Sequence, residues 1–200
     1  MNTLDRIQAI ADLTLALGEV NRATQHPDGR AETDTTHTVM LSLIVIDLAH
    51  ENGVDRADAT LFALVHDLAE AYAGDTNTAR GLNPQQVQDK SEREAAALAR
   101  IREDLSASPW VSSIIAHYEA QTNPAARFVR YLDKIMPKLT HRRNGCAAVK
   151  ALGMTLEEVR EKHVKQGLAL RKQYPEFPAL DALFWDACTA CEIAYLRGSP

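Results

Sequence analysis

The segment His66-Asp67-Leu68-Ala69-Glu70 places three ionisable side chains at the end of an apolar stretch, residues 61–65. A helix advances about 100° per residue, so His66 and Glu70 lie nearly above one another and Asp67 lies one step round the same side. Ionisable groups next to a buried stretch are destabilising unless they are paired or bound to a metal. Imidazole and carboxylate together suit a first-row divalent ion. The segment therefore predicts either a metal site or a polar helix end with a hydrogen-bonded histidine.

Two further residues have the same character. His37 begins an apolar stripe of helical spacing that runs to Val45, so its side chain is expected to point inward. Asp133 has apolar residues one helical turn before and after it, and a desolvated carboxylate there needs a cation or several donors. Taken singly, His37 could be a hydrogen-bonded core residue, and Asp133 could form an ordinary salt bridge with Lys134.

Taken together, these residues predict a catalytic metal centre. His37, His66, Asp67 and Asp133 supply two imidazoles and two carboxylates from three predicted helices. Four protein ligands leave positions open for water and substrate on a six-coordinate ion, which is typical of a catalytic metal and not of a closed structural one. Such a set accepts Mn, Co, Fe, Ni, Zn or Mg, so a divalent ion is predicted without its identity.

The composition is that of an ordinary globular chain. It has 200 residues, with 22 Lys and Arg against 27 Asp and Glu, a net charge of −5, and 46% hydrophobic residues. These values exclude an intrinsically disordered chain and favour a single domain spanning residues 1–200. The acidic balance argues against a nucleic-acid-binding protein. No stretch approaches the roughly 18 apolar residues of a membrane span, so a membrane protein is not expected.

The beginning of the chain lacks the basic and apolar regions of a signal peptide. The cysteines are odd in number, which does not make a disulfide framework. Cys188 and Cys191 form a C-x-x-C motif inside an apolar helical run, where packing is the expected role. A reducing, cytoplasmic location fits these features best.

Apolar residues recur at helical spacing along nearly the whole chain, which predicts an all-α, single-domain helical bundle. The polar segment 21–33 is expected to be an ordered loop, with Thr35 or Asp34 capping the helix that follows. One helix is expected to begin near Asp55 and to run through the histidine–aspartate doublet to Gly74. Thr155 with Glu158 is a capping box for the C-terminal helices, residues 155–196. Three later helices are each predicted from a capping residue followed by proline: Asn83-Pro84, Ser108-Pro109 and Asn123-Pro124.

This pattern resembles the HD-domain phosphohydrolases, which are defined by a histidine, a histidine–aspartate doublet and a later aspartate. The closer resemblance is to the small 5′-nucleotidases, including the bacterial 5′-deoxynucleotidases, and it covers roughly residues 17–141. It implies an HD-type helical bundle that needs a divalent metal. The stretches that carry it are Arg30-Ala31-Glu32 leading to His37, Ala63 to Glu70, Gly74-Asp75, and Ala126 to Lys134.

The resemblance also implies roles for individual residues. The four predicted ligands match the metal ligands of the family. Glu70 matches the carboxylate that orients or deprotonates the attacking water, and Asp75 matches a second carboxylate near the phosphate. Arg22 lies where an N-terminal arginine contacts the substrate phosphate. The branch has a tryptophan after that arginine and often an acidic residue before the first histidine, whereas this chain has Ala23 and Thr36.

Basic residues near the predicted centre are candidates to stabilise the negative charge of a phosphoryl group. The first candidates are Arg22, Arg30 and Lys134. The second candidates are Lys138, His141, Arg142 and Arg143.

The sequence is compatible with three functions. The first is hydrolysis of a nucleoside 5′-monophosphate, most of all a deoxynucleotide, and the second is release of tripolyphosphate from a deoxynucleoside triphosphate. The third is a noncatalytic nucleotide-sensing module, against which Glu70 and Asp75 argue because they would repel phosphate. The expected partner is a small-molecule nucleotide. The apolar C-terminal helix, with Phe184, Trp185, Cys188 and Ile193, could also support a homodimer.

Overall fold

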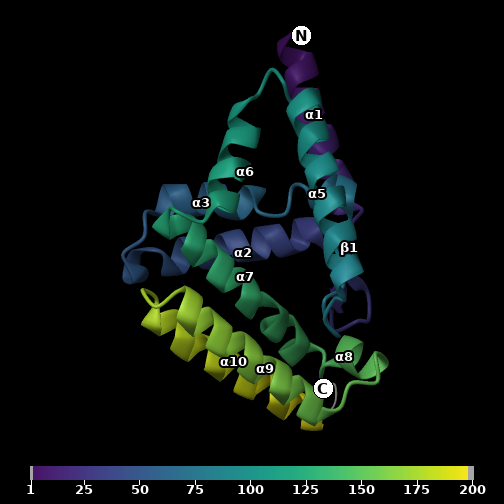
Figure 1. Ribbon diagram of the computed structural model, residues 1–200, viewed down its shortest axis with the longest axis vertical. Helices are drawn as coiled ribbons and strands as arrows, with labels where there is room; N and C mark the ends of the chain where they lie inside the picture. The colour runs from purple at the N-terminus through teal and green to yellow at the C-terminus, as the bar shows by residue number, and fades with distance from the viewer. Residues whose placement is uncertain (1, 198–200) are drawn as a thin grey trace.

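The computed structural model describes residues 2–197 and is almost entirely helical (Figure 1). This confirms the predicted all-α, single-domain bundle. The helices are α1 (Thr3–Gly18), α2 (Asp34–Leu48), the short 3₁₀ helix η1 (His50–Asn52), α3 (Arg56–Val65), α4 (Glu70–Ala73), α5 (Pro84–Asp104), α6 (Trp110–Ala120), α7 (Pro124–Arg143), α8 (Ala147–Ala151), α9 (Leu156–Gln173) and α10 (Pro178–Arg197).

Several helices begin where the sequence predicts. Asn83 and Thr155 each form a reciprocal capping box, at the beginnings of α5 and α9. Asp55 caps α3, and Asn123 precedes the proline that begins α7. These local signals therefore fix the beginnings of the long helices.

Two helix beginnings differ from the prediction. The cap of α2 is Thr33, whose Oγ1 accepts a hydrogen bond of 3.2 Å from the Thr36 backbone N–H, and not Thr35 or Asp34. Asp34 is fully buried, and its carboxylate accepts a hydrogen bond from Arg22. The Asp34 side chain therefore does not cap the helix. At α6 the cap position is Pro109 itself, without a side-chain hydrogen bond.

Residues 21–33 form an antiparallel hairpin, so the prediction of an ordered loop is wrong. β1 (Asn21–Gln25) pairs with β2 (Ala31–Thr33), and Asn21 lies opposite Thr33. Gly29 in the turn has a φ of +85°, a conformation that glycine adopts without strain. The hydropathy pattern does not reveal the hairpin because the buried side chains of its strands are polar. They are Thr24 and Glu32, with Asp34 directly after β2.

The helix predicted through the histidine–aspartate doublet is interrupted there. α3 ends at Val65, and the following backbone N–H groups bond to carbonyls three residues back, as from Leu68 to Val65 at 3.2 Å and from Glu70 to Asp67 at 2.8 Å. This 3₁₀ spacing aligns residues i and i+3. It therefore aligns Asp67 with Glu70, whereas a continuous helix would align His66 with Glu70.

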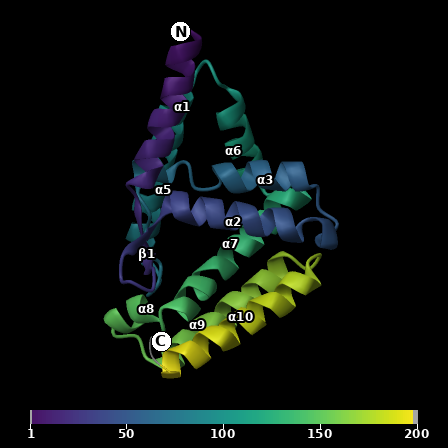
Figure 2. The same cartoon turned by 180° about the vertical axis from the view of Figure 1, so that it is seen from behind.

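The central element is α7, which packs against α2 and α3 on one side and against α10 on the other (Figures 1 and 2). Its buried apolar residues include Phe128, Tyr131, Leu132, Ile135 and Met136. A second buried cluster joins α1, α3, α5 and α6 and contains Leu13, Val65, Ile101, Leu105, Val111 and Ile115. Asp133 thus lies on the most enclosed helix of the bundle.

The C-terminal helix closes the core. Phe184 and Cys188 of α10 are buried in the same cluster as α7, while Ile193 is 43% exposed. A homodimer through this helix stays a prediction. None of the helices within residues 2–197 is long and apolar enough to cross a membrane.

The cysteines are free and buried, which confirms the packing role predicted for the C-x-x-C motif. Cys191 contacts Cys146, a cysteine outside the C-x-x-C motif. The two sulfur atoms are 3.3 Å apart.

Gly167 on α9 is required by the packing of α10. A Cβ atom at this position would overlap the Trp185 ring and would lie 2.9 Å from the Phe184 ring. Gly167→Ala is therefore expected to destabilise the fold by about 1–3 kcal/mol, because an inserted methyl group overpacks the contact. Urea denaturation measures this loss. Gly18→Ala is the matched control, since its Cβ would make only an ordinary 3.5 Å contact with Thr35, and equal stability losses in the two variants would contradict the explanation.

Candidate metal centre

The four predicted ligands converge from three places in the chain. His37 comes from α2, His66 and Asp67 from the turn after α3, and Asp133 from α7. One nitrogen or oxygen atom of each lies within 4.8 Å of the corresponding atoms of the others. His37 Nε2 is 3.1 Å from Asp133 Oδ1, and His66 Nε2 is 2.9 Å from Asp67 Oδ2. This set of donors suits a first-row divalent cation.

His66 is prepared to act as a ligand through Nε2. Its Nδ1 lies 2.8 Å from the Ala63 carbonyl oxygen, which fixes the proton on Nδ1 and leaves the Nε2 lone pair directed at the cluster. Nε2 is buried and finds no hydrogen-bond partner among residues 2–197. Asp67 Oδ2 lies 2.9 Å from this nitrogen without forming a hydrogen bond to it, an arrangement that suits two ligands of one cation, so the residues fit a metal.

His37 is oriented by a carboxylate behind it. Glu32 Oε1 lies 3.4 Å from His37 Nδ1, and Glu32 Oε2 accepts hydrogen bonds from Thr24 (2.5 Å) and Thr140 (3.1 Å). Burial disfavours the imidazolium, but Asp133 and Glu32 raise the pKa of His37 to about 9. This carboxylate–histidine arrangement is the common support of a metal-binding imidazole.

The centre carries an excess of carboxyl groups. Arg22 Nη1 binds Asp34 Oδ1 at 2.7 Å and Asp67 Oδ2 at 2.9 Å, and it lies 3.9 Å from Glu70 Oε2. Lys134 Nζ binds Asp133 Oδ2 at 2.7 Å. These two bases and His37 face a larger group of buried or half-buried carboxyls, so a divalent cation would offset the remaining negative charge. The carboxyls are Glu32, Asp34, Asp67, Glu70 and Asp133.

The pKa values of the carboxyl groups diverge. Burial, with the charges of Asp67 and Asp34, raises the pKa of Glu70 to about 10. Burial acts in the same direction on Asp67, but His66 holds the pKa of Asp67 well below its usual range. The surroundings thus favour the neutral form of Glu70 and the ionised form of Asp67.

The remaining predicted residues are placed unequally. Lys134 lies at the centre. Asp75 lies near enough to Glu70 for its negative charge to contribute to the raised pKa of Glu70. Arg30 does not reach the centre. It lies in the hairpin turn, its side chain is 81% exposed, and its Nε binds Asp28 at 2.7 Å.

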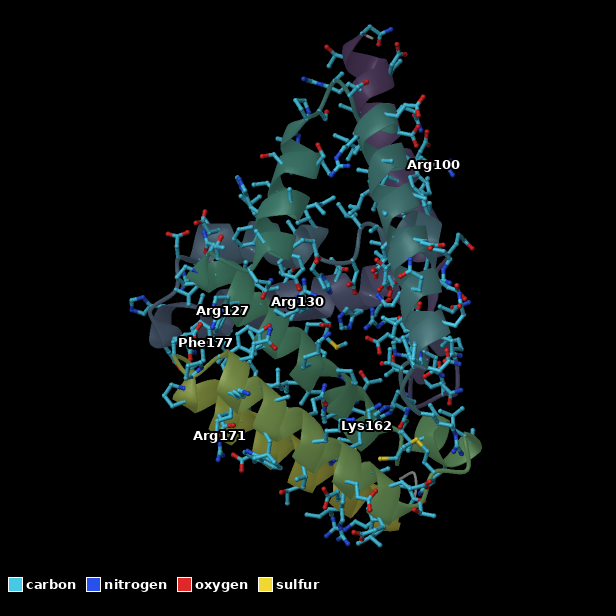
Figure 3. All side chains as sticks on the ribbon, in the orientation of Figure 1. Arg100, Arg127, Arg130, Lys162, Arg171 and Phe177 are labelled. Atoms are coloured by element: carbon cyan, nitrogen blue, oxygen red, sulfur yellow. The ribbon has the colours of Figure 1, made fainter. Side chains whose placement is uncertain are left out.

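A cavity of about 220 Å³ opens beside the metal ligands. Arg130 forms part of its wall, and Figure 3 shows this side chain near the middle of the molecule, where α7 passes α2. The Arg130 guanidinium lies 4.4 Å from the centre of the Tyr118 ring and binds Glu119 at 3.0 Å. The other lining residues include His66, Asp67, Glu70, Lys90, Glu94, Asp133 and Lys134.

Sequence reasoning missed three residues of the site: Glu32, Asp34 and Arg130. Glu32 lies in the middle of β2 and Asp34 directly follows the strand, and their inward orientation follows from strand alternation that no apolar pattern marks. Arg130 lies four residues before Lys134, so helical spacing places both on one side of α7 and could have identified it.

Glu32→Gln is expected to weaken metal binding by about 10–100-fold, because removing the charge behind a ligating histidine lowers its basicity and loosens its orientation. Competition with a chelator measures the affinity. Glu19→Gln, at an exposed carboxylate, is the matched control. Unchanged affinity in Glu32→Gln would show that Glu32 does not support His37.

The fold and the site define a helical protein built around a two-histidine, two-aspartate metal centre. A family model described as HD domain matches residues 16–172, and the chain belongs to this family. A crystal structure of a predicted metal-dependent phosphohydrolase from Magnetospirillum magnetotacticum MS-1 has the same fold, with a TM-score of 0.70 and 24% sequence identity. That likeness covers 98% of this chain and 100% of the other. No curated protein matches the chain.

Proposed function

We propose that the protein is a metal-dependent phosphohydrolase that removes phosphate from nucleoside 5′-monophosphates, and from deoxynucleotides in particular. The observation that carries the proposal is the convergence of the four ligands beside Glu70 and an open cavity. The relative from M. magnetotacticum, described as a predicted metal-dependent phosphohydrolase, supports the class through its shared fold. The nucleotide part rests on the resemblance of residues 17–141 to the 5′-nucleotidases.

His37, His66, Asp67 and Asp133 would hold the cation. A bound divalent ion supplies a water of lowered pKa and positive charge toward a phosphoryl oxygen. The protein contributes the fixed orientation of the ligands, since His66 is held by the Ala63 carbonyl oxygen and His37 by Glu32.

Glu70 is the residue assigned to orient the attacking water and to accept its proton. It is not one of the four ligands, and its Oε2 is buried without a hydrogen-bond partner in the described part of the chain. Burial and the surrounding negative charge raise the pKa of Glu70, and positive charge in the ligand set would lower it again and favour the carboxylate. Asp75 is assigned as a second carboxylate near the same water.

Lys134 and Arg22 are assigned to the substrate phosphate. Lys134 is 41% exposed, so its ammonium group is accessible from the cavity. Arg22 uses Nη1 for the carboxylates, and a guanidinium has further N–H donors to offer. Arg130 is a third candidate on the cavity wall. Charge-assisted hydrogen bonds from these groups stabilise charge that builds up on the phosphoryl oxygens.

The size of the cavity favours a compact substrate. Ligand sites for drug-sized molecules occupy about 300–1,000 Å³. A cavity of about 220 Å³ therefore supports a monophosphate over a triphosphate.

A substrate screen on the purified protein tests the proposal. Elemental analysis is expected to find one divalent metal per chain, and nucleoside 5′-monophosphates are expected to yield inorganic phosphate. Release of tripolyphosphate from deoxynucleoside triphosphates would show that triphosphates, and not monophosphates, are the substrates. Nucleotide binding without turnover across several metals would identify a sensor and overturn the enzymatic proposal.

A further inference from the structure

A group of basic side chains lies at the C-terminal half of α7, away from the metal centre. Lys138 and His141 of α7 face Lys162 and His163 of α9 around an internal cavity of about 70 Å³. Figure 3 shows Lys162 well below Arg130, which lines the metal-centre cavity. The two cavities share no lining residue.

The lining of this second cavity is basic. Four of its described lining residues are basic and none is acidic. Lys138 is only 6% exposed, and its Nζ has neutral neighbours: the Lys134 carbonyl oxygen at 2.8 Å, the Gln166 side-chain oxygen and the Phe184 ring. A buried ammonium with neutral partners is costly, so the cavity favours a negatively charged occupant.

His141 adds a buried polar atom that forms no hydrogen bond. Its Nδ1 is buried and has no hydrogen-bond partner within residues 2–197. Burial, together with the charge of Lys138, lowers the pKa of His141 to about 4, and burial lowers the pKa of Lys138 to about 8. Glu192 is the acidic residue next to His163, with its Oε1 3.0 Å from His163 Nδ1. The same carboxylate accepts a hydrogen bond of 3.1 Å from Arg160 Nε, so its negative charge is shared with Arg160.

The inner cavity connects to the surface. It shares Ala79, Met154, Lys162 and Gln166 with a groove of about 540 Å³. The groove adds two further basic residues, Arg80 and Lys165, together with Glu158 and Glu161. The groove therefore adjoins the inner cavity and has room for an organic group attached to an anion bound there.

The inner volume matches a small polyatomic anion. A water needs about 10–15 Å³ of cavity, and this one is several times larger. A tetrahedral oxyanion presents several acceptor oxygens at once, which suits donors converging from two helices.

We propose that the cavity between Lys138, His141, Lys162 and His163 is a second anion site, independent of the metal, that binds an oxyanion of the phosphate class. The groove with Arg80 would receive the organic part of a phosphate monoester. The shared ligand chemistry is the phosphate group, free or esterified.

Phosphate binding to the chelator-treated full-length protein tests this site without the metal centre. Removal of the ion would take away the positive charge that helps to hold phosphate at that centre, where carboxyl groups outnumber the bases. Calorimetric titration with inorganic phosphate at constant ionic strength is expected to show binding to the wild type. Lys138→Met is expected to weaken it by about tenfold or more, the loss of one charge-assisted contact. Lys172→Met, at an exposed lysine on α9, is the matched control and is expected to bind as the wild type does.

Two outcomes overturn the proposal: no binding of phosphate to the wild type, or equal binding to the wild type and Lys138→Met. If Lys138→Met does not fold, as judged by circular dichroism, Lys162→Met provides the same comparison at a less buried position. A nucleoside 5′-monophosphate distinguishes the sources. Tighter binding of the ester that is lost in Arg80→Ala supports an esterified ligand, and equal affinities support free phosphate.

Discussion

Asp67→Ala is expected to abolish metal retention and phosphate release together. Asp67 Oδ2 lies within 3.9 Å of both ligand histidines and 2.9 Å from Arg22, so its removal takes away one ligand and one partner of the arginine. Loss of a direct ligand should exceed the 10–100-fold effect typical of groups behind the ligands. Elemental analysis and phosphate release, measured on the same preparation, check both losses.

Thermal unfolding gives a readout of metal binding that does not depend on activity. A ligand present at 100 times its dissociation constant stabilises the native state by about 2.7 kcal/mol, so a chelator should lower the unfolding temperature of the wild type. Asp67→Ala should show no such shift. The control is Asp58→Ala, at an exposed aspartate on α3, which should behave as the wild type does. Retention of the metal by Asp67→Ala would remove Asp67 from the ligand set.

The convergence of the ligands could be predicted from the sequence because each one conflicts with its surroundings. His37 and Asp133 occupy positions that helical periodicity assigns to the core, where an ionisable group needs a partner. Several such groups in one helical chain are relieved together if they meet around a cation. The structure places one atom of each of the four within 4.8 Å of the others.

The rest of the centre could not be read from hydropathy. Hydrophobic periodicity detects a strand by its apolar face, but the buried face of the hairpin carries Thr24 and Glu32, which serve the charged centre. For the same reason, hydropathy could not show which of the two candidate arginines reaches the centre. Arg22 lies on β1 and reaches the carboxylates, whereas Arg30 lies in the exposed turn, and only the hairpin register distinguishes them.

The interruption after Val65 lies equally outside what periodicity can detect. The 3₁₀ spacing from Val65 to Tyr72 depends on the carbonyls that the backbone N–H groups select, and an apolar pattern does not encode that choice. Its effect is chemical, because it aligns Glu70 with Asp67, near the Arg22 guanidinium. The sequence predicted that Glu70 belongs to the site, but with a different neighbour.

Glu70→Gln is expected to keep the metal and lose turnover. Glutamine preserves the size of the side chain and leaves the four ligands intact, but it cannot accept a proton. Loss of a general base typically lowers the rate by about 10²–10⁴-fold. The measurement is the steady-state rate, together with the metal content of the same sample, and the KM should change less than kcat.

Glu94→Gln is the matched control for this prediction, because Glu94 lines the same cavity and its charge is paired with Lys90. It should retain wild-type turnover if the effect at Glu70 is chemical and not a general loss of negative charge. A pH profile separates the two explanations further. A base that must be deprotonated gives wild-type activity that rises with pH through the pKa of Glu70 in the metal-loaded protein, and Glu70→Gln should lack this rise. Full activity in Glu70→Gln would assign the proton transfer to another residue, with Asp75 the next to test.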